Sequence, residues 1–498
     1  MADKRNDEEK ADPNENDKCI GNKKEDEKKK KSWKDFCVAN MKALLVIIIL
    51  CVLLFIVFVV MLVFAVKLKR LQEPGPSRCL SSGCLKVAAD AIARMDTSYD
   101  PCTNFWVYSC GNWMKTHNLT DDKGSRNVED VMRDQIFHQL RYLIDLVPSR
   151  ADERTPEWKV KRFFTSCMKT EDIEYSSFNN LRNKINELGG WNIVPNTWSL
   201  QRWDVDKLVE RLHKNYGVDV FFKISVDIDD INPEIIIIKM EPAGLGLPDP
   251  SYYEQSNLEQ IMPSIELLLN PEESYKKMTV DALKSLAPKI KWLDLLQAYF
   301  PLSEISVDTE VAIVHPQYFR DLSDFLIAKG IEEINNYLMW RLLSHYADHL
   351  PDRFRNLQNK FRRFLEGVED QEVPVEERWH FCIRQTNRYL GLALGSMYVK
   401  KYFSPASKLQ ARTLVNAIKD TFVEEMGDIS WLDTTSQEIA KEKILSSSVL
   451  LGYPELMTDY HAELVVQTEY LENIFAGEYF LREKKRDLLI RSPDPEHR

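Results

Sequence analysis

The longest apolar run in this chain of 498 residues covers positions 43–66, where none of 24 side chains is charged. As a helix rising about 1.5 Å per residue it would extend roughly 36 Å, which exceeds the roughly 30 Å of bilayer hydrocarbon. A cleaved signal sequence has a shorter apolar core and a small-residue cleavage site, and neither is present. The run therefore predicts a single transmembrane helix.

The basic residues flanking this run predict its orientation. Eight lysines lie between positions 23 and 42, and four basic residues lie between positions 67 and 78. The amino-terminal side should therefore be cytoplasmic, and the large carboxyl part should be extracellular, as in a type II protein of the plasma membrane. We expect a disordered cytoplasmic tail at 1–42, a stalk at 67–78 and a folded ectodomain at 79–498.

Downstream of the stalk, most apolar residues recur with the 3.6-residue period of amphipathic helices. The segments 85–95, 160–167, 334–349 and 414–426 illustrate this period. In 222–240, by contrast, apolar and polar residues alternate up to a polar turn, and the apolar run 235–238 follows. The patterns predict a mainly α-helical ectodomain with one small β-hairpin whose second strand is buried.

Charge excludes one class of partner. The net charge is −11, and positions 1–42 hold 12 basic and 11 acidic groups, a balance of +1. The remainder is therefore −11 − 1 = −12. A domain this acidic is not expected to bind nucleic acid.

Six cysteines lie on the exported side, where an oxidising compartment favours disulfides; they are Cys79, Cys84, Cys102, Cys110, Cys167 and Cys382. Sequence alone allows 15 pairings of six cysteines. Cys79 and Cys84 flank a turn-like spacer and can close a small loop. This pairing leaves Cys167 and Cys382 as a long-range pair.

The two remaining cysteines fall in a predicted short helix. Asp100 is a suitable N-cap, Pro101 suits the first turn, and Gly111 suits the position after the helix. On such a helix Cys102 and Cys110 would be about 12 Å apart, beyond the roughly 7 Å limit for a disulfide. Both thiols would then have no partner in this chain.

Several motifs, in order over some 400 residues, resemble the ectodomain of neprilysin and the endothelin-converting enzymes. They are Cys79–Trp113, Thr165–Cys167, Gly189–Trp191, Leu245–Pro248 with Tyr252–Tyr253, Tyr337–Arg341, Trp379–Cys382, Trp431–Asp433, Glu442–Lys443 and Leu451–Pro454. This resemblance implies a membrane-bound zinc metalloendopeptidase that cuts small extracellular peptides. It also implies two mainly helical lobes around a chamber that excludes folded substrates, and it is compatible with a homodimer.

In the family, the catalytic lobe comes chiefly from a carboxyl-terminal part, and cysteines like Cys102 and Cys110 pair with cysteines there. The zinc site requires His-Glu-x-x-His, a pair of imidazoles one helical turn apart with a glutamate that activates water. None of the nine histidines in this chain is followed by glutamate. We therefore expect no catalytic residue, no zinc ligand and no activity in this chain alone, which would be the anchor and covering lobe.

The resemblance assigns one substrate contact. An arginine that follows serine just before a helix helps hold the substrate's terminal carboxylate in the family, and Arg126 follows Ser125 here. The spacing to Arg133 is one residue shorter than in neprilysin, and a solvated surface arginine is the alternative.

Three further motifs have simple interpretations. His345 and His349 have metal-ligand spacing, but Tyr346 stands where a catalytic base belongs, so we interpret them as ordinary helix histidines. Gly244-Leu245-Gly246 lacks the third glycine of a nucleotide loop and is expected to form a tight turn. Asn118 begins an Asn-Leu-Thr acceptor for N-glycosylation in a surface loop.

An alternative function belongs to another class: a non-catalytic ectodomain that binds peptides or a partner protein, with Cys102 and Cys110 free or bonded between chains. A hydrolase using a serine or cysteine nucleophile has no nucleophile motif to support it. A transcript that continues in frame past Arg498 into a His-Glu-x-x-His sequence would decide for the metallopeptidase.

Overall fold

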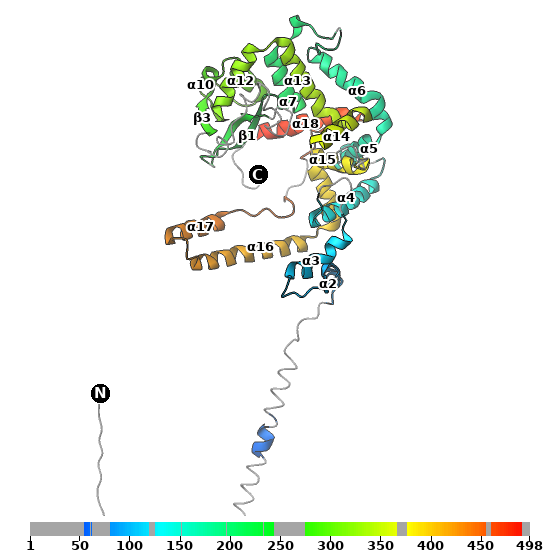
Figure 1. Ribbon diagram of the computed structural model, residues 1–498, viewed down its shortest axis with the longest axis vertical. Helices are drawn as coiled ribbons and strands as arrows, with labels where there is room; N and C mark the ends of the chain where they lie inside the picture. Colours follow the sequence, from blue (N-terminus) through cyan, green and yellow to red (C-terminus); the bar gives the residue numbers. More distant parts are fainter. Residues whose placement is uncertain are drawn as a thin grey trace, which may run out of the picture. The chain divides into compact units, whose positions relative to one another are not determined.

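The computed structural model describes residues 54–59, 61, 80–118, 125–150, 152–195, 197–232, 234–243, 274–365, 376–454 and 460–490 (Figure 1). The chain divides into two compact units, residues 1–118 and 119–498. Most of the predicted transmembrane run at 43–66 lies outside the described residues. Within this run, residues 54–59 and 61 are described, and they are helical. No helix within the described ranges is both long and apolar enough to cross a membrane.

The described residues 80–118 of the first unit form the short helices α2 (Ser82–Arg94) and α3 (Phe105–Thr116). The Asn112 side chain on α3 donates to the Ala93 carbonyl at the end of α2 over 2.8 Å. The buried carboxylate of Asp96 accepts from Lys115 Nζ at 2.6 Å and from the Ser98 backbone N–H at 3.1 Å. These bonds lower the pKa of Asp96 to about 2, with Lys115 the largest cause.

The predicted boundaries of the helix around Cys102 are wrong. Asn104 is the N-cap of α3, since its side chain accepts from the Val107 N–H at 3.0 Å. Asp100 instead caps a turn before the helix, and Cys102 lies in that turn. Gly111 does not end the helix but lies buried inside it, where a Cβ would be 2.9 Å from Val107 Cγ1. Because glycine has no Cβ atom, α3 can pack closely at this position.

The second unit is mainly helical, as predicted. Its helices are α4 (Val128–Leu146), α5 (Pro156–Met168), α6 (Thr170–Glu187), α7 (Val205–Tyr216), α10 (Val280–Leu286), α11 (Trp292–Tyr299), α12 (Pro316–Ala328), α13 (Ile331–Tyr346), α14 (Asp352–Leu365), α15 (Arg378–Tyr402), α16 (Pro405–Glu425), α17 (Thr434–Ser446) and α18 (Tyr470–Asp487). Short 3-10 turns are η1 (Leu200–Arg202), η4 (Ala347–His349) and η5 (Met426–Asp428). The four segments that show the helical period fall in α2, α5, α13 and α16, except that Met95 follows α2 and that residues 347–349 and Met426 belong to the turns η4 and η5.

Local sequence explains several of these helix ends. Asn127 and Asp130 form a reciprocal capping box at the start of α4. Thr155 caps α5, and Pro156 occupies its first turn. Gly217 ends α7 with a φ of 65°, in the left-handed region that favours glycine.

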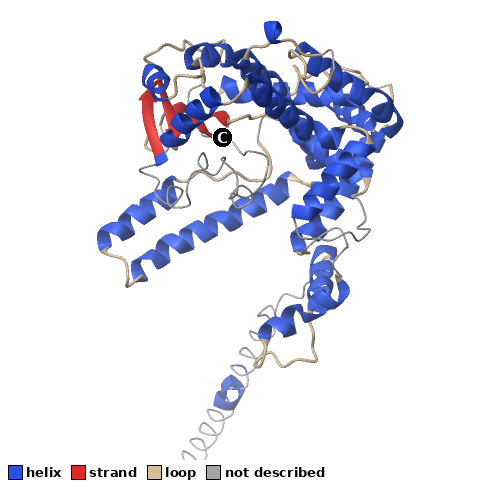
Figure 2. Cartoon of the chain, turned by 45° about the horizontal axis from the view of Figure 1, so that its top comes forward, coloured by secondary structure: helices blue, strands red, loops and turns tan. Residues whose placement is uncertain are grey.

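The predicted hairpin is confirmed as β1 (Phe222–Ile228) paired antiparallel with β2 (Ile236–Pro242), with Val226 opposite Ile238. It is one half of a four-stranded sheet in the order β1-β2-β4-β3. Figure 2 shows strands in red among the blue helices. The strand β4 (Glu310–Val314) runs parallel to β2, and β3 (Tyr275–Thr279) pairs antiparallel with β4. Sequence analysis did not identify these two strands, because each has only five residues and pairs at long range.

A single hydrophobic core joins the helices α4–α7, α10–α13, α15 and α18 to the sheet. Within it, the Phe163 ring lies 5.7 Å from that of Tyr389 and 6.1 Å from that of Tyr470, between centroids. Trp292 and Phe222 are also fully enclosed. The core therefore connects elements more than 200 residues apart in sequence.

Candidate functional site

The long-range disulfide predicted between Cys167 and Cys382 is present. It joins α5 to α15, both sulfurs are fully buried, and the two Cα atoms are 5.7 Å apart. The loop it closes is long, since the two cysteines are 215 positions apart. Cys84 is disulfide-bonded as well, and Cys79 lies outside the described residues.

Cys102 and Cys110 are free thiols, and both are exposed. The helix from which their separation was inferred begins only at Phe105, so Cys102 lies before it. Asn118 is also exposed, two residues after α3 ends. Residues 119 and 120 of its glycosylation motif lie outside the described residues.

Arg126 lies in the extended segment before α4, as predicted for an arginine preceding a helix. Its Nη2 atom is 3.9 Å from Asp134 Oδ2 on α4, and 23% of its side chain is exposed. The substrate contact of Arg126 stays a prediction.

His345 and His349 do not form a metal-binding pair of one helix face. The helix α13 ends at Tyr346, so His349 falls in the tighter turn η4. His349 is buried, and its Nδ1 atom is 2.9 Å from the Tyr470 hydroxyl, whereas His345 is exposed. Burial lowers the pKa of His349 to about 3, which keeps the ring neutral in the core. Within the described ranges, no group of three or more His, Cys, Asp or Glu residues could hold a metal ion.

A charged cluster around the buried Glu478 joins α15, α18 and the segment that follows α7, and sequence reasoning missed it. Glu478 Oε1 accepts from Arg388 Nη2 and from the Tyr389 hydroxyl, both at 2.7 Å. One turn later, Arg482 donates to both carboxylate oxygens of Asp219 at 2.9 and 3.0 Å. Burial raises the pKa of Tyr389 well above its usual range, and the Glu478 charge adds to this. No sequence motif marks these residues, since helix packing alone brings them together.

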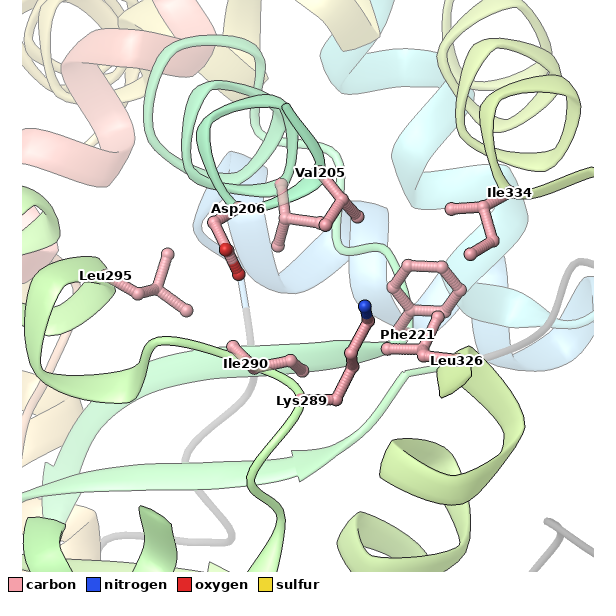
Figure 3. Close-up of a pocket in the computed structure, with 9 residues that line it drawn as sticks. Val205, Asp206, Phe221, Lys289, Ile290, Leu295, Leu326 and Ile334 are labelled. Carbon is pink, nitrogen blue, oxygen red and sulfur yellow. The ribbon is translucent and has the colours of Figure 1, made fainter. Parts of the chain in front are cut away.

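Two pockets are small compared with the roughly 300–1,000 Å³ of ligand sites. The first holds about 10 Å³ and is lined by residues of α7, α11, α12 and α13 and of the segments just before β1 and just after α10. Figure 3 shows Phe221, Lys289 and Asp206 in its wall. The second holds about 80 Å³ beside Arg486 at the end of α18. Neither is large enough for a peptide substrate.

Neither α16 nor α17 contains a buried residue, a feature that they share with α14 among the helices of this unit. Leu414, Ile418 and Phe422 form one stripe on α16, with exposed fractions of 62%, 60% and 44%. We call these three residues the hairpin face. Trp431, between the two helices, is 80% exposed. Figure 1 shows the pair side by side, and contact at its base includes a Phe403–Tyr453 ring pair at 5.9 Å.

The chain is similar to known proteins over most of its length. The family model for Peptidase family M13 matches residues 101–264 and 255–454. Endothelin-converting enzyme 1 of Bos taurus is 28% identical over 428 residues, which are 77% of this chain and 55% of the relative. The rat enzyme is 27% identical over 84% of this chain and 60% of the relative. The chain thus spans little more than half the length of these relatives.

Solved structures show the same fold. The zinc metalloprotease Zmp1 of Mycobacterium tuberculosis, in complex with inhibitor, superposes with a TM-score of 0.67 at 18% identity. That match covers 81% of this chain and 65% of the other. PepO of Lactobacillus rhamnosis gives a TM-score of 0.64 at 18% identity, over 78% and 66% of the two chains. With both family model and fold in agreement, the chain belongs to peptidase family M13, the zinc metallopeptidases of the neprilysin and endothelin-converting enzyme type.

Proposed function

We propose that this chain supplies the membrane anchor and the covering lobe of a zinc metalloendopeptidase that processes small extracellular peptides. Its family membership supports the reaction class. The zinc ligands and the catalytic glutamate would come from a carboxyl-terminal polypeptide, because no histidine of this chain is followed by glutamate. The donor set of this chain does not fit a catalytic zinc, and we derive no catalytic step from it.

The hairpin face is the observation that carries this proposal. Two helices without a buried residue have little tertiary packing to stabilise them, and tertiary packing supplies most of the stability of helices in proteins. Residues 405–446 lie inside the segment that the family model matches, and the relatives contain further polypeptide that this chain does not cover. We propose that this further polypeptide covers the hairpin face.

The exposed thiols support the same arrangement. Cys102 and Cys110 have no disulfide partner among the described residues, although the other described cysteines are bonded. Each is proposed to form a disulfide with the carboxyl-terminal polypeptide. Arg126 is proposed to bind the substrate's terminal carboxylate, in exchange for its contact with Asp134.

The apolar run at 43–66 is proposed to anchor the protein in the plasma membrane with the lobe outside. The excess of lysines on the amino side supports this orientation. On the same basis Asn118 is proposed to carry a glycan. Pairing of two subunits is compatible with the family, and a zinc ion is expected only in the assembled enzyme.

The test compares this chain with the product of its natural transcript. We expect the transcript to continue in frame past Arg498 into a His-Glu-x-x-His sequence, and the longer protein to hydrolyse small peptides in a chelator-sensitive way. The chain of residues 1–498, purified in the same manner, should show no chelator-sensitive hydrolysis. Activity of the short chain would refute the proposed division of labour.

A transcript that stops near Arg498 would instead favour a non-catalytic ectodomain that binds peptides or a partner protein. Mapping of the disulfides of the native protein by mass spectrometry also distinguishes the peptidase proposal from this alternative. The peptidase proposal expects Cys102 and Cys110 bonded to carboxyl-terminal cysteines, whereas the alternative expects them free or bonded between chains.

A further inference from the structure

The larger of the two pockets lies where α7, the segment after α11 and the last turns of α18 meet. Its wall includes four charged residues, Lys214 of α7 and Glu483, Arg486 and Asp487 of α18. Residues 300–303, which follow α11, also line it. We call this space the α18 pocket.

Arg486 is a buried cation without an anionic partner. The residue is only 6% exposed, and its Nη1 atom is enclosed without a hydrogen-bond partner. The guanidinium carbon lies 5.3 Å from the ring centroid of Tyr299 and 5.5 Å from that of Tyr479, and Arg486 forms no ion pair among the described residues. Aromatic rings offset only part of the cost of burying a cation, and buried charges in proteins are normally paired. An anionic group in the α18 pocket supplies the missing partner.

The other charged groups of the pocket are not paired with one another either. Lys214 Nζ donates to the Ala298 carbonyl at 2.7 Å, and it has no carboxylate partner in the part of the chain that the structure describes. Glu483 and Asp487 are one helical turn apart on α18, and neither forms an ion pair there. The pocket therefore brings together two positive and two negative groups that make no direct contact with each other.

This combination of charges selects the class of ligand. A simple anion would be repelled by Glu483 and Asp487, and a simple cation would be repelled by Arg486. A neutral molecule would leave all four charges without a partner. A ligand that carries both a carboxylate and an ammonium group can satisfy both signs at once. The carboxyl-terminal end of α18, at Asp487, adds partial negative charge that also favours the ammonium group.

The size and the rim of the pocket narrow the choice further. The space is about 80 Å³. An enclosed water takes roughly 10–15 Å³, so the pocket has room for about five non-hydrogen atoms, enough for the ammonium, Cα and carboxylate of an amino acid. Three apolar or aromatic side chains of its wall are partly open to solvent, Leu302 at 74%, Ile490 at 53% and Tyr479 at 38%. An apolar side chain of the ligand would pack against them.

We propose that the α18 pocket binds a free α-amino acid with an apolar side chain. The cations Arg486 and Lys214 hold its carboxylate. The carboxylates Glu483 and Asp487 hold its ammonium group, and the apolar rim covers its side chain. The proposal does not rest on the peptidase function, because every group that it uses belongs to this chain.

The experiment measures binding of L-leucine to the full chain. The chain is held in phosphatidylcholine nanodiscs, and ligand binding is titrated by saturation-transfer NMR, with empty nanodiscs as the blank. We expect saturable binding of leucine below about 10 mM. Isocaproate, which lacks the ammonium group, and isoamylamine, which lacks the carboxylate, should each bind at least about tenfold more weakly.

Variants of the charged wall identify the site. Glu483→Gln together with Asp487→Asn should weaken leucine binding at least about tenfold, because the partners of the ammonium group are lost. The same variant should strengthen isocaproate binding about threefold, because repulsion of the carboxylate is removed. Arg486→Gln should weaken the binding of both ligands at least about tenfold. Lys485→Gln, which replaces an exposed cation of α18 outside the pocket wall, is the control and should change neither.

Three results would overturn the proposal: no saturable binding of leucine, isocaproate binding as tightly as leucine, or leucine binding unchanged in the Glu483→Gln and Asp487→Asn double variant. Circular dichroism and thermal unfolding verify that each variant is folded. If the buried Arg486→Gln substitution prevents folding, the double variant still decides, because its two carboxylates are only half-buried and have no ion-pair partner among the described residues.

Discussion

The helices α15 and α16 follow each other directly in sequence but depend on different surroundings. Ten residues of α15 are buried, among them Cys382, Tyr389 and Leu394, whereas α16 has none. Both segments carry apolar residues at helical spacing, so the difference does not arise from their patterns alone. One helix packs against other elements of this chain, whereas the other presents an apolar face that stays exposed among the described residues.

The largest difference in stability is expected when a phenylalanine side chain is removed from each of the two regions. Phe163 on α5 is fully buried in the core that contains α15, whereas Phe422 on α16 is 44% exposed. We expect Phe163→Ala to lower the free energy of unfolding by about 3–5 kcal/mol, through lost burial and a cavity. Phe422→Ala should cost less than about 1 kcal/mol. Urea denaturation measures both, and similar costs would contradict the contrast.

The second-largest effect on stability is expected for the disulfide that links α15 to α5. Replacing Cys167 and Cys382 by serine should lower the free energy of unfolding by about 2–5 kcal/mol, since a long loop is released in the unfolded chain. The same replacement at the exposed thiols Cys102 and Cys110 should change it by less than about 0.5 kcal/mol. A large loss from this control pair would show that the thiols stabilise the isolated chain.

A pH effect distinguishes the buried histidines of the core region. Burial lowers the pKa of His349 to about 3, against about 6.5 in the unfolded chain. Below pH 6.5 the unfolded state therefore binds more protons than the folded state. The free energy of unfolding decreases as the pH is lowered from about 6.5 to about 3. Between pH 7 and 5 the loss from this group is about 2 kcal/mol. His213 and His461, whose pKa values burial lowers to about 4, contribute with the same sign.

The measurement is the free energy of unfolding at pH 7 and pH 5 for the native chain and for His349→Gln. The variant should lose about 2 kcal/mol less over this interval. His138→Gln, which replaces an exposed ring on α4, serves as the control and should show the native dependence. An unchanged pH dependence in His349→Gln would mean that this ring can be protonated in the folded core.

The smallest effect is expected on the hairpin face. Ile418→Ser should change the free energy of unfolding of this chain by less than about 0.5 kcal/mol, because the side chain is already 60% exposed. Hydrogen exchange should be faster in α16 and α17 than in α15, since few buried contacts oppose local opening. If the longer natural protein covers this face, the same substitution should become measurably destabilising there. Equal protection of α15 and α16 in the short chain would contradict the comparison.

Part of this structure could be predicted from residues that are close in sequence. Periodicity predicted the helices that contain Cys167, Met339 and Ile418, and alternation predicted the hairpin β1–β2. The Cys167–Cys382 disulfide followed from eliminating the other pairings. The boundaries of α3 were wrong, because Asn104 outcompetes Asp100 as the cap and Gly111 is kept inside the helix by packing.

The sequence by itself thus determined the mainly helical character of the ectodomain, where the first two strands meet, the family and the absence of a His-Glu-x-x-His motif. Tertiary structure alone decided the pairing of β3 with β4, the cluster around Glu478, and the exposure of the hairpin face. The physical reason is that helix and strand periods are local, whereas partners for a carboxylate or an apolar face depend on which distant surfaces the fold brings together.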